Sequence, residues 1–93
     1  MKTIKQASIY LVKVEYTPEF KDMKQGFLYY SEKYEVATHL CLCGCKHICS
    51  MPIKNGEWSI IEESKGVTII PSILQRFECK SHYIVNNGIA NFV

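Results

Sequence analysis

Two groups of residues in this 93-residue chain carry the side chains that bind metal ions. The first is Cys41-Leu42-Cys43-Gly44-Cys45, and the second is Cys79-Lys80-Ser81-His82. Zinc prefers four thiolate or imidazole ligands, and two short ligand groups from separate loops supply them in tetrahedral geometry. Gly44 suits the unusual backbone angles that a chain needs to wrap its sulfurs around one ion. The sequence therefore predicts a zinc site with five candidate ligands: Cys41, Cys43, Cys45, Cys79 and His82.

The spacing leaves two ligand sets open. If the three early cysteines bind together with Cys79, then His82 is left for chemistry. If His82 binds, one early cysteine is a spare thiol. An iron–sulfur cluster is the alternative to zinc, but a Rieske-type cluster needs two histidines and one is in place here. The alternation over His47–Ile53 places Cys49 on the same strand face as Met51, so we interpret Cys49 as a buried apolar side chain.

Serine and histidine side chains close to these ligands could form a nucleophile–base pair. Ser81 and His82 are neighbours, and neighbours on a strand face opposite sides. A pair would therefore combine Ser81 or Ser72 with a histidine from another segment, such as His39 or His82. His39 is the expected base if His82 binds metal, and His82 takes that role if four cysteines complete the metal shell. Ser81 could instead donate a hydrogen bond to a metal-bound sulfur.

Length and composition limit the class of protein. A chain of 93 residues is too short for two separate cores, so we expect a single zinc-binding domain over residues 1–93. The net charge is +2 and the lysines are scattered, which argues against nucleic acid and anionic membranes as partners. The sequence has no apolar run of membrane-spanning length and no signal peptide, which predicts a cytoplasmic protein. Gly-rich phosphate loops and the HExxH and GxSxG motifs do not occur.

Alternating apolar residues and turn signals predict a mainly β fold, either a small β-sandwich or a partly open barrel. One or two short helices are expected, after Thr17-Pro18 and over Ser31–Ala37. Asn55-Gly56 and Asn87-Gly88 predict hairpin turns. The expected strands are Ser8–Glu15, Gly26–Ser31, His47–Ile53, Glu57–Glu62, Val67–Ile70, Ser81–Val85 and Ile89–Val93.

Taken together, several segments resemble a small bacterial and phage family whose hallmarks are a CPCGC-like element, a PSI turn and a terminal CxSHY. The matching segments here are Gly26–Ser31, Thr38–Cys45, Trp58, Pro71-Ser72-Ile73 and Cys79–Tyr83. Members are often encoded beside bacterial ubiquitin-like proteins and their E1- and E2-like enzymes. The resemblance implies a zinc-bearing peptidase that trims or releases a ubiquitin-like partner. Leu42 stands where the family tends to have proline, which should loosen the loop without removing a ligand.

Two functions follow as hypotheses. The first is a hydrolase of peptide or ester bonds, in which a serine hydroxyl activated by histidine attacks and zinc holds the scaffold. The second is a non-catalytic zinc-stabilised module that binds a protein partner, because a closed Cys3His shell leaves no position for a catalytic water. A thiol or redox role for a spare cysteine is a third, weaker alternative. The resemblance favours the hydrolase.

Overall fold

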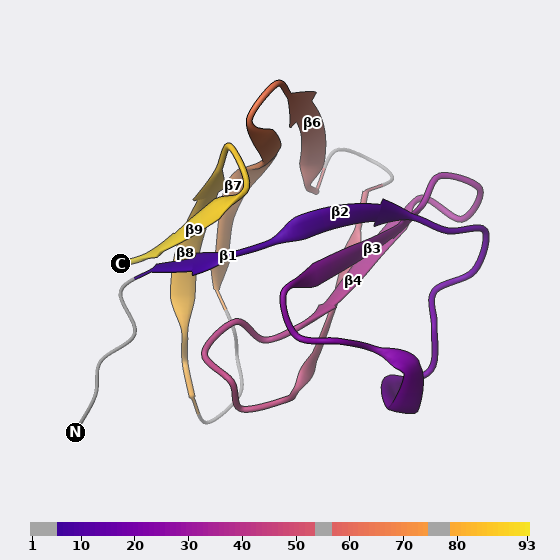
Figure 1. Cartoon of the computed structure of the whole chain (residues 1–93), viewed down its shortest axis with the longest axis horizontal. Helices are drawn as coiled ribbons and strands as arrows, with labels where there is room; N and C mark the ends of the chain where they lie inside the picture. Colours follow the sequence, from indigo (N-terminus) through magenta and orange to yellow (C-terminus); the bar gives the residue numbers. More distant parts are fainter. Residues whose placement is uncertain (1–5, 54–56, 75–78) are drawn as a thin grey trace.

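Alternating apolar and polar residues build two open β-sheets that pack against each other (Figure 1). The computed structural model describes residues 6–53, 57–74 and 79–93. The larger sheet is antiparallel throughout. Its strands, in spatial order, are β1 (Gln6–Ser8), β9 (Ile89–Phe92), β8 (His82–Asn86), β7 (Gly66–Leu74) and β6 (Ser59–Glu63).

The smaller sheet has four strands and includes one parallel pair, β2 with β3. Ile9 is fully buried where the chain passes from β1 in the larger sheet to β2 in the smaller one. Its backbone N–H donates to the Gly88 carbonyl across 2.9 Å. The first strands therefore join the two sheets along one side. In spatial order, the strands of this sheet are β2 (Tyr10–Lys13), β3 (Phe27–Ser31), β4 (Val36–Leu40) and β5 (Ile48–Pro52).

The mainly β prediction is confirmed, and most of the local expectations hold. Asn87-Gly88 joins β8 to β9 with φ values of 52° and 79°, as a two-residue hairpin turn requires. A short 3₁₀ helix, Phe20–Asp22, follows Pro18. The Asn55-Gly56 turn lies outside the described residues. No helix in the described parts of the chain is long and apolar enough to cross a membrane.

The helical turn expected over Ser31–Ala37 is wrong, because this segment closes a hairpin instead. The Ser31 hydroxyl accepts a hydrogen bond from the Tyr34 backbone N–H, and β4 begins at Val36. The same hydroxyl donates to the Glu15 carbonyl, 2.7 Å away. Serine favours such local bonds in turns as readily as it caps helices, so its presence did not discriminate between the two structures.

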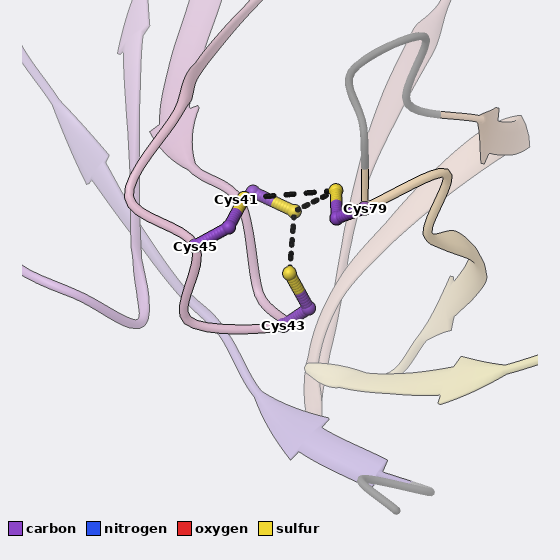
Figure 2. Close-up of side chains that lie close together, drawn as sticks. All are labelled: Cys41, Cys43, Cys45 and Cys79. Carbon is purple, nitrogen blue, oxygen red and sulfur yellow. Dashed lines mark hydrogen bonds between the residues drawn. The ribbon is translucent and has the colours of Figure 1, made fainter.

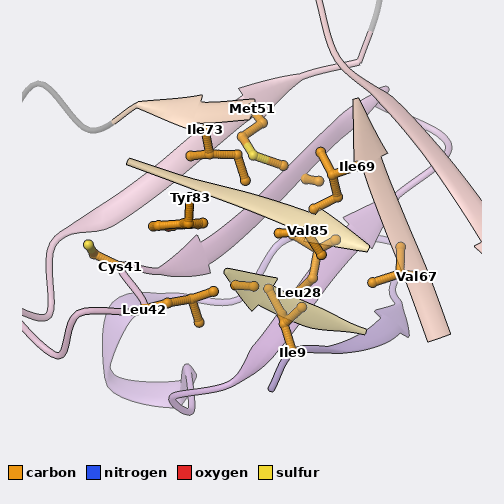
Figure 3. Packing of buried hydrophobic residues seen from close by; sticks show 12 residues of the cluster. Ile9, Leu28, Cys41, Leu42, Met51, Val67, Ile69, Ile73, Tyr83 and Val85 are labelled. Atoms are coloured by element: carbon orange, nitrogen blue, oxygen red, sulfur yellow. The ribbon is translucent and has the colours of Figure 1, made fainter. Parts of the chain in front are cut away.

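The core fills the space between the sheets (Figure 3). Leu28 and Met51 from the smaller sheet pack with Ile69 and Val85 from the larger sheet, and all four are at least 98% buried. Burying side chains of this size is the main stabilising contribution available to a chain this short. The complete cluster of buried residues is Ile9, Leu28, Ala37, Cys41, Leu42, Met51, Val67, Ile69, Ile73, Tyr83, Val85 and Ala90.

A buried hydrogen bond also links the sheets. His39 on β4 and Tyr83 on β8 are both fully buried, and the His39 Nε2 atom lies 2.7 Å from the Tyr83 hydroxyl. The rings meet edge to face with centroids 6.0 Å apart. Burial lowers the pKa of His39 to about 4, so its ring is neutral at pH 7. This pair fixes β4 just before Cys41 and β8 just after His82.

Replacing Tyr83 with phenylalanine should destabilise the protein by about 1–3 kcal/mol, because the buried Nε2 of His39 loses its partner. Urea unfolding followed by fluorescence measures this change. Tyr10→Phe is the matched control, since Tyr10 is 62% exposed and its hydroxyl can reach water. Equal unfolding free energies for the two variants would contradict a stabilising role for the buried hydrogen bond.

Candidate functional site

The loop between β4 and β5 carries three of the candidate metal ligands. Cys41 follows the last residue of β4, and its backbone N–H donates to the His47 carbonyl across 2.8 Å, which closes the loop at its base. The Gly44 N–H in turn donates to the Cys41 carbonyl. Gly44 has a φ of 94°, while a Cβ atom there would meet nothing within 4 Å. The glycine is therefore favoured for its backbone angle rather than for space.

The fourth candidate ligand, Cys79, lies in the segment that leads into β8 of the other sheet. Figure 2 shows the Cys79 side chain facing those of Cys41, Cys43 and Cys45. The Cys41 sulfur is 3.4 Å from that of Cys43 and 3.8 Å from that of Cys79, and the Cys45–Cys79 separation is 3.6 Å. The four sulfurs all lie within 4.8 Å of one another. This cluster of four thiols, called the sulfur cluster below, could hold one metal ion.

Backbone amides surround the sulfur cluster as hydrogen-bond donors. Each sulfur accepts the N–H of the residue two positions further along the chain, which for Cys79 is Ser81. Three of the four intervening residues, Gly44, Lys46 and Lys80, have positive φ, at 94°, 66° and 45°. Successive residues bent in this way direct N–H groups inward and favour negatively charged atoms at the centre. The backbone is thus shaped to receive thiolates.

The four thiols differ in acidity. Burial raises the pKa of the Cys41 thiol well above its usual range, and burial also raises that of Cys45. For Cys79, burial acts in the same direction, but hydrogen bonds from the backbone N–H and hydroxyl of Ser81 outweigh it and lower the pKa to about 6. Burial also acts to raise the pKa of Cys43, but hydrogen bonds from the Ser81 hydroxyl, the Cys45 backbone N–H and the neighbouring thiols together outweigh it and lower that pKa.

Ser81 therefore sits beside the sulfur cluster. Its hydroxyl donates to Cys79 and Cys43 rather than to a histidine ring. His47, which the sequence analysis did not single out, places its Nδ1 atom 3.3 Å from the Cys45 sulfur. A histidine two positions after a ligand cysteine is the signal that could have pointed to this contact. Ser81 and His47 therefore contact the sulfur cluster without being among its four thiols.

His82 lies outside the sulfur cluster and contacts Ser72 instead. The His82 Nε2 atom is 2.8 Å from the Ser72 hydroxyl, and both side chains are partly buried. Ser72 lies in an irregular part of β7, where the register to β8 shifts between Ile69 and Ile73. Such bulges redirect side chains and are common beside active sites. The Ser72–His82 pair is a hydroxyl and an imidazole at hydrogen-bond distance, the arrangement that activates a serine nucleophile.

His39, the other candidate base, contacts neither serine. Its Nε2 atom bonds Tyr83, and its buried Nδ1 has no hydrogen-bond partner among the described residues. The sequence analysis missed Tyr83 as this partner. The signal was available in strand alternation: if His82 faces outward on β8, then Tyr83 must face the core. Cys49 pairs with His39 across β4 and β5 and packs against the core, apart from the sulfur cluster.

The comparisons with known proteins give one family. The family model described as "Bacterial ubiquitination-like system serine protease (BubE)" matches residues 13–93 of the chain. No curated protein and no solved structure gave a match. A ubiquitination-like system implies protein partners, and the family's name specifies a serine protease.

Replacing Cys43 with serine should remove the bound metal, since the sulfur cluster would keep three thiols, whereas Cys49→Ser should retain it. Metal analysis of the purified proteins should give about one equivalent per chain for Cys49→Ser and a small fraction of that for Cys43→Ser. The thermal midpoint should fall sharply for Cys43→Ser alone, because metal binding and folding are coupled. Metal loss in Cys49→Ser would place that residue in the ligand set and contradict the four-thiol assignment.

Proposed function

Because this chain belongs to the BubE family of serine proteases from bacterial ubiquitination-like systems, we propose that it cleaves at the C-terminal tail of a ubiquitin-like protein. In this proposal Ser72 is the nucleophile, His82 is the base, and zinc in the sulfur cluster stabilises the scaffold. The observation that carries it is the 2.8 Å separation between the Ser72 hydroxyl and the His82 Nε2 atom.

The chemistry follows from that contact. With the Nδ1 atom carrying the ring proton, His82 accepts the Ser72 proton at Nε2 as the serine oxygen attacks the carbonyl carbon of the scissile bond. The imidazolium then donates the proton to the leaving amine, and the C–N bond breaks to leave an ester on Ser72. His82 then takes a proton from a water molecule, whose oxygen attacks the ester carbon. The bond from that carbon to the Ser72 oxygen breaks, the imidazolium returns its proton to this oxygen, and the carboxylic acid product leaves and ionises in water.

Ser81 supports this assignment by the contacts it makes. Its hydroxyl and backbone N–H are both directed at sulfurs of the cluster, which leaves Ser72 as the serine with a base beside it. Outer hydrogen bonds of the Ser81 kind orient ligands and strengthen metal sites. We therefore assign Ser81 to the metal site and Ser72 to catalysis.

Zinc fits the sulfur cluster. A tetrahedron with Zn–S bonds of about 2.3 Å has edges of about 3.8 Å. Three of the six sulfur–sulfur distances, at 3.4, 3.6 and 3.8 Å, are close to that edge, and all six are within 4.8 Å. When bound, the ion would supply a structural cross-link between the β4–β5 loop and the segment that leads into β8. Four thiolates would close the metal shell, so we assign the hydrolytic chemistry to Ser72 and His82. We also propose that residues 1–93 work as one domain around a shared core.

The closed thiolate shell also favours the second candidate function, a non-catalytic module that binds a protein of the ubiquitination-like system. A shell filled by four sulfurs has no position for a catalytic water. The two functions differ in one measurable property, which is whether the bound ubiquitin-like protein is shortened.

Ser72→Ala should abolish cleavage of the tail, lowering kcat/KM by a factor on the order of 10⁴ or more, with metal content and folding unchanged. Ser81→Ala is the matched control. It keeps the nucleophile, and its metal affinity should fall about 10- to 100-fold, with activity restored by added zinc. The substrate is a ubiquitin-like protein from the same system that still carries residues after its processing site. Mass spectrometry of this substrate measures cleavage by both variants, with and without added zinc. Undiminished cleavage by Ser72→Ala would contradict the assignment, and binding without cleavage by the wild type would support the non-catalytic module.

Removing the metal should inactivate the protein through its effect on His82. Cys79 lies three residues before His82, so loss of its anchor frees the segment that aims the imidazole at Ser72. A chelator should lower the thermal midpoint strongly and eliminate cleavage, and added zinc should restore both. Metal-free protein that cleaves at the wild-type rate would show that the sulfur cluster does not position the pair.

A further inference from the structure

We propose that the outer face of the five-stranded sheet docks the folded body of the ubiquitin-like protein, so that its tail reaches Ser72. This inference rests on the proposed function and adds to it the surface that recognises the substrate. The outer face is the side of β1, β9, β8, β7 and β6 that points away from the core (Figure 1).

Four isoleucines are exposed on this outer face, one from each of β6, β7, β8 and β9. They are Ile61, Ile70, Ile84 and Ile89, with exposed fractions of 42%, 52%, 40% and 42%. Their neighbours in sequence point the other way: Ile69, Val85 and Ala90 are at least 98% buried, and Ile60 packs against the core. Alternation therefore places all four isoleucines on one side of the sheet. Exposed apolar residues gathered on one face mark interaction surfaces.

The isoleucines are continuous with the Ser72–His82 pair. Ile70 precedes Ser72 by two residues on β7, and Ile84 follows His82 by two residues on β8. His82 and Ile84 lie two apart on a regularly paired strand, so they share a face and lie about 7 Å from each other. Ile70 and Ser72 both lie in the irregular part of β7, and Ser72 is placed beside this face by its contact with His82. A partner seated on the isoleucines would therefore lie directly beside the reacting serine.

The rest of the outer face is almost free of charge, although 22% of the chain's residues are charged. Among the described strand residues that point outward by alternation, Glu63 at the end of β6 is the one carboxylate, none is lysine or arginine, and His82 is the one imidazole. Interface centres are depleted of charged residues in the same way. The outward polar residues of the five strands are Gln6, Ser8, Ser59, Glu63, Thr68, Ser72, His82, Asn86 and Asn91.

The extent of the surface favours a folded partner over a tail alone. From β6 to β9 the isoleucines cross three strand spacings, or about 14 Å. An extended tail bound at Ser72 is a single strand wide, so it would cover only part of this distance and leave most of the isoleucines in water. The apolar surface of a folded domain can cover all four at once, and in a ubiquitination-like system that domain is the one that carries the tail.

Kinetics on two substrates test this proposal. The first substrate is the whole ubiquitin-like protein with its tail, and the second is a short peptide with the tail sequence alone. Ile89→Asp and Ile84→Asp should each lower kcat/KM for the whole protein about tenfold or more, mainly by raising KM, because a charge enters a desolvated apolar contact. Cleavage of the peptide should be unchanged for Ile89→Asp, which lies two strands away from Ser72.

Ile48→Asp is the matched control, because Ile48 is also 40% exposed but lies on β5 of the other sheet. It should leave the cleavage of both substrates unaffected.

Wild-type kcat/KM for the whole protein in Ile84→Asp and Ile89→Asp would overturn the docking surface and leave the protease assignment intact. If the wild type cleaves neither substrate, the protease assignment fails, and weaker binding of the whole protein to Ile89→Asp still supports docking. A dimer of this chain that Ile89→Asp dissociates would overturn the proposal in favour of a second copy.

Discussion

The convergence of four sulfurs at one point is the constraint on which this structure depends. Three of them lie in the loop between β4 and β5, and Cys79 lies three residues before β8, a strand of the other sheet. Small domains bury too little apolar surface to hold distant segments firmly by packing alone. A shared ion at this point would therefore fix two segments that are far apart in the sequence, and its position sets where the residues after Cys79 can lie.

Those residues each have a different contact, and alternation of the chain explains why. Ser81 donates to sulfur, His82 faces outward to Ser72, and Tyr83 faces inward to His39. The His39–Tyr83 bond holds the strand from the core side, while the sulfur cluster holds it at its beginning. His82 is therefore positioned by its neighbours on both sides, and the proposed role of His82 as the base for a weak hydroxyl nucleophile requires such preorganisation.

Local signals predicted the β-rich fold and the cysteines that converge. The alternation of Ile89–Phe92, the hairpin turn at Asn87-Gly88 and the spacing of Cys41, Cys43 and Cys45 all depend on nearby residues, which a sequence displays directly. The choice between His39 and His82 could not be made in this way. It depends on how β7 lies against β8, and the register shift between Ile69 and Ile73 that brings Ser72 to His82 has no signal in composition or spacing. The role of Ser81 was equally open, because a serine beside a ligand suits either task.

Covalent trapping of the nucleophile tests the central claim most directly. A fluorophosphonate reacts with a serine oxygen that a histidine has activated, and digestion followed by mass spectrometry locates the adduct. The structure predicts one adduct per chain, on Ser72, that disappears in His82→Ala while His39→Ala, if folded, retains it. An adduct on Ser81, or labelling of Ser72 that persists in His82→Ala, would contradict the Ser72–His82 pair as the reactive centre.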